Sequence, residues 1–255
     1  MSHFKISSVN LYIFTLLFII SCSNKKHASA LNNEFTPNGN TTNPFYKILP
    51  LGDSRVEGAT SNSVSYRYDL WKDLVKNEWN FDYIGTQQDN TIYPELMGQH
   101  FDPDHEGIGG YKTQDILDNI DDLIEDIGAP DVVLLGIGGN DLVRNISVTT
   151  VIDNINQIVD ILQNSNTNVT IFIEQIAPGR SNVMTPEALV IYNTFNENIS
   201  NLASEQTNES SSVIAVDMSA HWTDDYMEDN LHYNHLGAKE VADRYYEAIE
   251  TTLEK

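Results

Sequence analysis

Short apolar runs alternate with amphipathic segments along most of this 255-residue sequence, and this alternation limits the possible folds more than any other feature. Runs with the length of strands lie at residues 46–51, 81–84, 131–135, 169–173 and 213–216. Helical spacing of apolar residues marks the segments at 66–79, 113–127, 149–162, 186–205 and 235–253. The third run lacks polar alternation, as is typical of a strand that is buried on both faces. The pattern predicts a single α/β domain over residues 45–255, with helices on both faces of a parallel sheet.

Acidic residues outnumber basic residues by 37 to 14, and the formal charge is −23. A field of that sign repels nucleic acid and anionic lipid surfaces, so no nucleic-acid partner is expected. Neutral or cationic partners are more compatible with it, and a neutral polysaccharide would fit. The simpler interpretation is a solvated acidic surface with no role in recognition.

The first 22 residues are typical of an export signal. Lys5 precedes an apolar run at 11–20 that is too short to span a bilayer as a mature helix, and Cys22, the only cysteine, follows at its polar border. This junction resembles the bacterial lipobox, in which the cysteine is lipidated. The resemblance implies a membrane anchor on Cys22 and an extracytoplasmic place in the bacterial cell envelope, with an ordinary secretory signal as the alternative. Residues 23–44 are polar and without periodicity, which predicts a flexible tether.

Three glycine-bearing segments follow a predicted strand or precede a predicted helix, at residues 52–54, 106–111 and 136–141. Ser54 stands at the end of the first strand, where open α/β sheets place ligands, and a serine there can act as a nucleophile. An oxyanion hole could form from the backbone N–H groups of Ser54 and Gly110 and the side-chain amide of Asn140. A plain tight turn is the alternative at each glycine. Neither later segment has the spacing of a dinucleotide-binding or phosphate-binding loop, so no nucleotide cofactor is predicted.

Asp229 and His232 lie three positions apart, between the last predicted strand and the last predicted helix. If this segment turns, the carboxylate can hold the imidazole in one tautomer, and the neutral ring can accept the proton of Ser54. The start of a surface helix is the alternative interpretation. His221 and His235 are rival bases, but neither has a carboxylate three positions earlier.

These segments together resemble the four sequence blocks of the SGNH, or GDSL-type, hydrolases, and they occur in the order of that family. The stretches at 48–54 and 105–110 are, within the family, most similar to carbohydrate esterases of the acetyl-xylan esterase type. The resemblance implies a three-layer α/β/α sandwich with a flavodoxin-like, five-stranded parallel sheet. It also implies a serine esterase that needs no metal or other cofactor. The roles that it implies are nucleophile for Ser54, base for His232, orienting acid for Asp229, and oxyanion hole for Ser54, Gly110 and Asn140.

Two residues depart from the family pattern, and we expect both to affect the pocket. Arg55 stands where many relatives have an aliphatic residue, and Tyr233 follows the histidine where proline is common. Both are predicted to contact the substrate, as is Trp222, for which packing in the core is the alternative. The acidic segment at 100–106, inside a long stretch at 86–112 that is predicted to be irregular, lacks the glycine and late glutamate of a calcium loop. No metal site is therefore predicted.

The sequence as a whole predicts an extracytoplasmic esterase that removes short acyl groups, acetyl above all, from an acylated carbohydrate or another small ester. A lipid-directed esterase or thioesterase on the same fold is one alternative, and the absence of an extended apolar lid sequence favours short acyl groups over it. An inactive glycan-binding surface module is another alternative. The presence of every expected catalytic side chain argues against that module.

Overall fold

The computed structural model describes residues 44–58, 64–89 and 91–255. The predicted export signal at 1–22, its Cys22, and the predicted tether up to residue 43 lie outside the described residues. Within the described ranges, no helix combines the length and the apolar character that a bilayer crossing requires.

The described residues form seven strands and eight α-helices. The strands are β1 Tyr46–Gly52, β2 Phe81–Tyr83, β3 Gln87–Gln88, β4 Asp104–Gly107, β5 Val132–Gly136, β6 Thr170–Gln175 and β7 Val213–Asp217. The helices are α1 Ser54–Glu57, α2 Arg67–Lys76, α3 Thr113–Leu117, α4 Ile120–Ile127, α5 Gly139–Val143, α6 Val148–Ser165, α7 Pro186–Gln206 and α8 His235–Thr252. A short 3₁₀ helix, η1 at Asp224–Tyr226, precedes α8.

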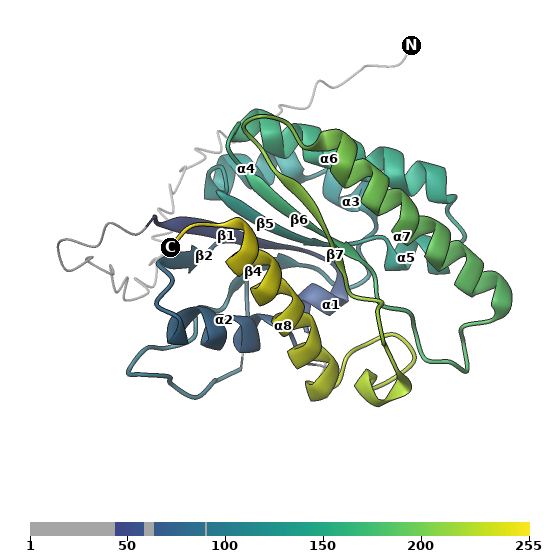
Figure 1. Cartoon of the computed structure of the whole chain (residues 1–255), viewed down its shortest axis with the longest axis horizontal. Coiled ribbons are helices and arrows are strands. Elements are labelled where there is room, and N and C mark those ends of the chain that lie inside the picture. The colour runs from purple at the N-terminus through teal and green to yellow at the C-terminus, as the bar shows by residue number, and fades with distance from the viewer. Residues whose placement is uncertain (1–43, 59–63, 90) are drawn as a thin grey trace, which may run out of the picture. The chain divides into compact units, whose positions relative to one another are not determined.

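The strands form one sheet in which β1 is central (Figure 1). On one side β1 pairs in parallel with β5, and β6 and β7 continue the parallel order. On its other side β1 pairs in parallel with β2 at its start and with β4 at its end. Gly52, the last residue of β1, is in register with Gly107 of β4 and with Gly136 of β5. The loops that follow these three strands therefore leave the sheet side by side.

Helices cover both faces of the sheet and enclose two separate apolar clusters. Side chains of α3, α4, α6 and α7 pack on one face, against alternate strand residues such as Leu49, Val133 and Ile171. Side chains of α2 and α8 pack on the other face, against residues such as Ile48 and Val132. Because successive strand side chains point to opposite faces, β1, β5 and β6 supply both clusters. The predicted three-layer sandwich around a parallel sheet is confirmed (Figure 1).

Side chains in the sequence determine where the three longest helices begin. Ser147 accepts a hydrogen bond from the backbone of the first turn of α6, and Thr185 does the same for α7, which starts with Pro186. Asn234 accepts from two backbone N–H groups in the first turn of α8. These side chains satisfy donors that lack a partner within the helix. The cap of α8 therefore lies two residues after His232, and the helix itself begins one residue later, at His235.

Two parts of the sequence-based prediction need correction. The segment at 86–112 was expected to be irregular, but it contains β3 and β4, and β4 joins the sheet beside β1. The polar sequence of β4 has no strand pattern, and only the last two residues of β4 pair with β1. The single helix expected at 113–127 is divided into α3 and α4. At the junction the Asn119 N–H donates to the carbonyl of Ile116 (3.0 Å), three residues earlier, and the Asn119 side chain donates to the carbonyl of Asp115 (2.7 Å).

Candidate active site

Ser54 lies on a tight turn that leads directly from β1 into α1. A Cβ atom added to Gly52 would lie 2.1 Å from the carbonyl oxygen of Gly136, so the two strand ends approach more closely than any side chain permits. Asp53 then caps α1, and its Oδ1 accepts a hydrogen bond from the Arg55 N–H (2.9 Å). The turn therefore places the hydroxyl of Ser54 at the carboxyl edge of the sheet, where parallel sheets bind ligands.

The structure places His232 between Ser54 and Asp229. The Oγ atom of Ser54 lies 3.0 Å from Nε2 of His232, although 178 positions separate the two residues. On the other side of the ring, Nδ1 lies 2.8 Å from Oδ2 of Asp229. The other carboxylate oxygen, Oδ1, accepts from the backbone N–H groups of Leu231 and His232, each at 2.7 Å. The four contacts together set the orientation of the imidazole.

The protonation state of Asp229 determines which ring nitrogen faces the serine. Burial alone would raise the pKa of Asp229, but hydrogen bonds from the His232 ring and from two backbone N–H groups lower it to about 2. Asp229 is therefore ionised at neutral pH, and a carboxylate only accepts hydrogen bonds. Nδ1 of the ring must carry the proton in this contact, which leaves Nε2 as an acceptor for the hydroxyl of Ser54.

A cavity of about 250 Å³ opens at Ser54. Its wall includes His232, Gly110 and Asn140, so four residues proposed from the sequence meet at one place. The Asn140 side chain is held by two contacts, in which Nδ2 donates to the carbonyl of Tyr111 (3.0 Å) and to Oδ2 of Asp53 (3.3 Å). Gly110 has a φ of +81°, a backbone conformation that side chains rarely adopt. The remaining lining residues are Asp53, Arg55, Gly139, Val143, Tyr192 and Leu231.

The three predicted substrate contacts have different outcomes. Arg55 lines the cavity, but its guanidinium group donates to the carbonyls of Leu231 and Ala177. Tyr233 is only 2% exposed, and Trp222 packs against it with ring centroids 5.2 Å apart. Neither of these aromatic residues lines the cavity. The predicted substrate contact of Tyr233 is corrected to packing, because its side chain is buried, whereas that of Trp222, which is only partly buried, stays a prediction. The rival bases His221 and His235 do not line the cavity either.

A buried carboxyl group that the sequence analysis did not single out lies beneath the site. Glu174 is 2% exposed on β6, accepts a hydrogen bond from the Tyr245 hydroxyl (2.9 Å), and lies against Gly136. Burial raises its pKa to about 7, although the Tyr245 hydroxyl and the Arg55 charge act in the opposite direction. The signal in the sequence was a glutamate that continues the apolar run of β6, but the predicted strand ended at residue 173, one residue before it.

The variant Glu174→Gln should become more stable than the wild-type protein as the pH rises. Between the ordinary pKa of 4.5 and the folded-state pKa of about 7, the folded protein keeps a proton that the unfolded chain releases. The stability of the wild-type protein therefore falls through this window, by about 3 kcal/mol from this group alone. The free energy of unfolding, measured in urea at a series of pH values, should exceed that of wild type in Glu174→Gln by an amount that grows across this window. A difference that stays constant with pH would contradict the assignment.

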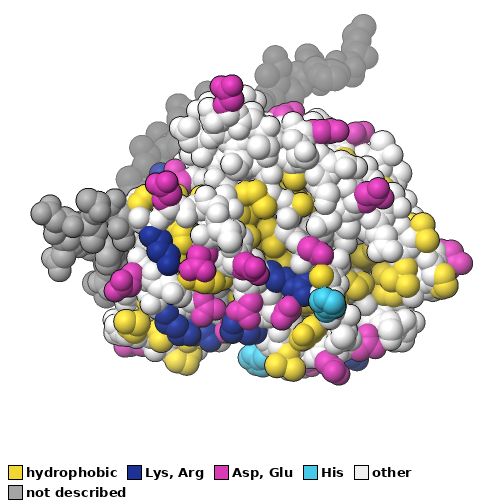
Figure 2. All heavy atoms as spheres, in the orientation of Figure 1, with side chains coloured by type: hydrophobic (Ala, Val, Ile, Leu, Met, Phe, Trp, Pro, Cys, Tyr) yellow, Lys and Arg dark blue, Asp and Glu magenta, His cyan; other side chains and the backbone are white. Residues whose placement is uncertain are grey.

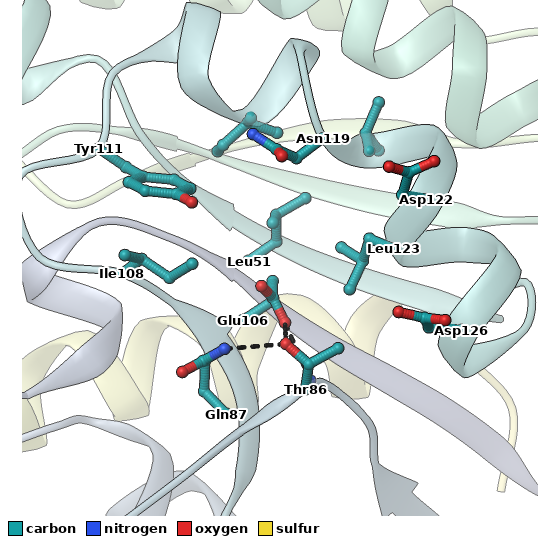
Figure 3. A pocket seen from close by; sticks show the side chains of 12 residues that line it. Leu51, Thr86, Gln87, Glu106, Ile108, Tyr111, Asn119, Asp122, Leu123 and Asp126 are labelled. Carbon is teal, nitrogen blue, oxygen red and sulfur yellow. Dashed lines mark hydrogen bonds between the residues drawn. The ribbon is translucent and has the colours of Figure 1, made fainter. Parts of the chain in front are cut away.

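A second cavity, of about 230 Å³, lies between β4 and the helices α3 and α4 (Figure 3). Leu51, Ile108 and Leu123 form apolar parts of its wall, and Asp122 and Asp126 add carboxylates from α4. The cavity shares no lining residue with the one at Ser54, and its lining includes no histidine. The serine and imidazole chemistry described above therefore belongs to the first cavity alone.

The acidic segment at 100–106 has structural contacts. Nδ1 of His105 accepts a hydrogen bond from the backbone N–H of Gly107 (3.0 Å), and Asp102 accepts one from the backbone of Tyr83 (2.7 Å). Within the part of the chain that the structure describes, no group of three or more His, Cys, Asp or Glu side chains is arranged to hold a metal ion. The Asp102 contact joins the residues before β4 to the end of β2. The Ile108 N–H, just after β4, donates to the carbonyl of Gly52 at the end of β1 (3.0 Å), two residues before Gly110.

Comparison with known structures identifies several proteins with the same fold. A family 3 carbohydrate esterase from Talaromyces cellulolyticus has a TM-score of 0.70 and 24% identity, over 81% of this chain and 97% of that one. A family 3 carbohydrate esterase from Clostridium thermocellum has a TM-score of 0.67 and 28% identity, over 82% and 96%. An acetyl xylan esterase, AlAXEase, has a TM-score of 0.60 and 19% identity, over 80% and 99%.

Comparison of sequences identifies the family. No curated protein sequence matches the chain closely enough to count as a relative. The model of the GDSL-like lipase/acylhydrolase family, however, matches residues 51–240, a range that contains Ser54, Gly110, Asn140, Asp229 and His232. The match extends over most of the chain, and the similar structures include the carbohydrate esterases predicted from the sequence. The chain therefore belongs to the GDSL-like lipase/acylhydrolase family, and its predicted class, a carboxylic ester hydrolase, is confirmed.

Proposed function

We propose that this protein is an extracytoplasmic serine esterase that removes acetyl groups from carbohydrate esters through Ser54, His232 and Asp229. The observation that carries the proposal is the chain of hydrogen bonds from Ser54 Oγ to the imidazole (3.0 Å) and from the imidazole to the carboxylate (2.8 Å). Ser54 and His232 both line a small cavity. The similarity to carbohydrate esterases supports an acylated carbohydrate as the substrate.

The first half of the reaction transfers the acyl group to the enzyme. Oγ of Ser54 forms a bond to the ester carbonyl carbon while its proton moves to Nε2 of His232, which already accepts a hydrogen bond from it. Asp229 stays ionised and stabilises the resulting imidazolium. When the tetrahedral intermediate collapses, the bond to the sugar oxygen breaks and His232 returns the proton to that oxygen. The products of this half are a free sugar hydroxyl and an acyl-enzyme.

The oxyanion of the intermediate needs donors that are in place before the reaction. The backbone N–H groups of Ser54 and Gly110 and the Nδ2 group of Asn140 are the candidates, since all three residues line the cavity. The contacts of Asn140 with Tyr111 and Asp53 hold its amide in position, so little reorganisation is required when negative charge develops.

The second half repeats the same proton movements with water. A water molecule gives one proton to His232 as its oxygen bonds to the acyl carbon, and the bond to Ser54 breaks in the next step. His232 returns its proton to Oγ, which releases acetic acid and restores the starting enzyme. Each proton transfer in this scheme uses a side chain that lines the cavity.

The surface and the amino terminus support a neutral glycan substrate outside the cytoplasm. Acidic side chains are spread over the face seen in Figure 2, with lysine and arginine side chains between them. Such a surface is compatible with an uncharged polysaccharide and repels anionic polymers. The lipobox-like junction at Cys22 supports a lipid anchor in a bacterial cell envelope. Labelling with a radioactive fatty acid that persists in Cys22→Ser would reject that anchor.

The proposed substrate is tested by the release of acetate from a panel of acetylated polysaccharides. Acetylated xylan should release acetate at a rate that depends on enzyme concentration, and the same polymers after chemical deacetylation are the control. Failure to release acetate from any acetylated glycan, with activity on a small chromogenic acetate, would reject the carbohydrate substrate and leave the esterase chemistry in place.

One observation favours the alternative of a lipid-directed esterase. An apolar groove of about 490 Å³ adjoins the cavity at Val143, Tyr192 and Leu231 and continues along Val183 and Ile191. Hydrophobic side chains gather on the α7 side of the face shown in Figure 2. A groove of this kind offers an acyl chain a surface on which each buried methylene contributes about 0.8 kcal/mol.

The length of the acyl chain separates the two substrates. If the protein is an acetylesterase, kcat/KM for p-nitrophenyl esters should fall steadily from acetate to octanoate. If the groove binds acyl chains, kcat/KM should instead rise with chain length, and Val183→Asp should reduce the octanoate rate while the acetate rate stays unchanged.

A further inference from the structure

Arg55 follows the nucleophile in the sequence and contacts two other segments of the chain. Its Nε group donates to the carbonyl of Leu231 (2.9 Å), and Nη1 donates to the carbonyl of Ala177 (2.8 Å). Nη1 also lies 3.3 Å from the hydroxyl of Tyr233, above whose ring the guanidinium carbon sits at 4.9 Å from the centroid. The side chain thus joins α1 to the end of β6 and to the residues on both sides of His232.

We propose that Arg55 is a positioning residue that holds the imidazole of His232 at hydrogen-bonding distance from Ser54. The proposal rests on the function proposed above, because it assigns to Arg55 a part in the same reaction. It replaces the substrate contact expected from the sequence. Since Arg55 and Ser54 are consecutive residues of α1, any movement of the nucleophile is passed on to the segment that carries the base.

The segment that carries His232 depends on such contacts. It connects β7 to α8 and contains only the short 3₁₀ helix η1 and an isolated bridge between Met227 and Tyr233. The backbone bond from Glu228 N–H to the carbonyl of His232 (2.9 Å) closes a local turn, but it does not connect the segment to the sheet. The loop after β6 supplies part of that connection, because the Arg180 N–H donates to the carbonyl of Asn230 (3.0 Å) and its Nη2 group donates to the carbonyl of Met227 (2.7 Å). Arg55 supplies the contacts nearest the base, at Leu231 and Tyr233, one residue before and one residue after it.

The chemistry of the guanidinium group suits this position. Arginine presents several donors in one rigid plane and stacks on aromatic rings, whereas lysine has one flexible ammonium group. Asp53 and Glu174 lie close enough for their charges to affect Arg55, so the part-buried cation has acidic groups nearby. Lysine at this position would keep the positive charge but could not reach the two carbonyls and the Tyr233 ring together.

The test compares Arg55→Gln and Arg55→Lys with a matched control, Arg244→Gln. Arg244 also donates to two carbonyls, those of Asp217 at the end of β7 and of Ala220 in the connection to α8, and neither of these residues is next to His232 in the sequence. A small displacement of a catalytic group costs up to about 10²-fold in rate. We expect kcat on a chromogenic acetate to fall by roughly that factor in Arg55→Gln and by less in Arg55→Lys, with KM unchanged. Arg244→Gln should keep the wild-type kcat.

Hydrogen–deuterium exchange gives a second readout that does not depend on activity. In Arg55→Gln the amides of residues 229–234 should exchange faster than in wild type, while those of β5 and β6 stay unchanged. If Arg55→Gln fails to fold, Arg55→Lys and Tyr233→Phe, which removes one partner of the guanidinium, serve for both measurements.

Two results would overturn the proposal. A rise in KM with an unchanged kcat would make Arg55 a substrate contact, and unchanged exchange at 229–234 would show that it does not hold this segment. If the protein is not a serine esterase that uses Ser54, a third result is expected, which differs from both of these. In that case Ser54→Ala would retain its activity, while the exchange measurement on Arg55→Gln would still report on the contact itself.

Discussion

Replacing Ser54 with alanine should lower kcat for a small chromogenic acetate by about 10⁶-fold, the loss that follows removal of the nucleophile in a serine hydrolase. The substitution removes only Oγ, the atom that lies 3.0 Å from Nε2 of His232. Without it no acyl-enzyme forms, and the oxyanion donors can accelerate only the direct attack of water. The measurement is the initial rate with p-nitrophenyl acetate, together with labelling by a fluorophosphonate probe, which the variant should lose.

The loss in Ser54→Ala must come from the chemistry and not from unfolding. Oγ of Ser54 is part-buried and contacts the imidazole across the cavity, so its removal should leave the circular dichroism spectrum and the midpoint of thermal unfolding close to those of wild type. A correctly folded variant that retains more than a small fraction of the activity, or that still reacts with the fluorophosphonate, would show that another residue is the nucleophile.

Asn140→Ala should reduce kcat by roughly 10²–10³-fold and change KM little. The side-chain amide would stabilise the oxyanion, which exists only after attack, so its removal affects the transition state more than the bound substrate. Its present contacts, 3.0 Å to the carbonyl of Tyr111 and 3.3 Å to Asp53, keep the amide fixed in the wall of the cavity. Steady-state kinetics on the same acetate ester separate kcat from KM.

Asn154→Ala is the matched control for Asn140→Ala. Asn154 is buried, at 7% exposure, and its Nδ2 donates to Oγ1 of Thr113 (3.1 Å), but it does not line the cavity at Ser54. Its loss should lower stability and leave kcat unchanged. If the two variants lose activity equally, the effect of Asn140 is on folding, and the amide is not an oxyanion donor.

The sequence was sufficient to predict the fold because strands buried on both faces contain few polar residues. The continuously apolar run of β5 and the helical spacing of α6 and α8 are signals of this kind. β4 was not predicted because its residues are Asp104, His105, Glu106 and Gly107, which have no apolar pattern. Its burial results from pairing with β1, a contact between distant segments that no local pattern records.

The candidate site was predictable where a short motif fixes the local geometry. Ser54, Gly110 and Asn140 follow strand ends, and His232 precedes a helix that Asn234 caps, so their approach to one edge follows from the topology. The direction in which a long side chain turns was not predictable. Arg55 lines the cavity, but its Nε group donates to the carbonyl of Leu231, and this contact exists only in the folded protein.

The separation of 178 positions between Ser54 and His232 has a consequence for the synthesis of the protein. A nascent chain that has emerged only as far as β7 already carries Ser54, yet it still lacks His232, the imidazole that lies against that serine in the folded protein. Domains of this size generally fold as units once their sequence is complete. The chain should therefore remain without esterase activity throughout translation, and activity should appear only when the carboxyl-terminal helix docks.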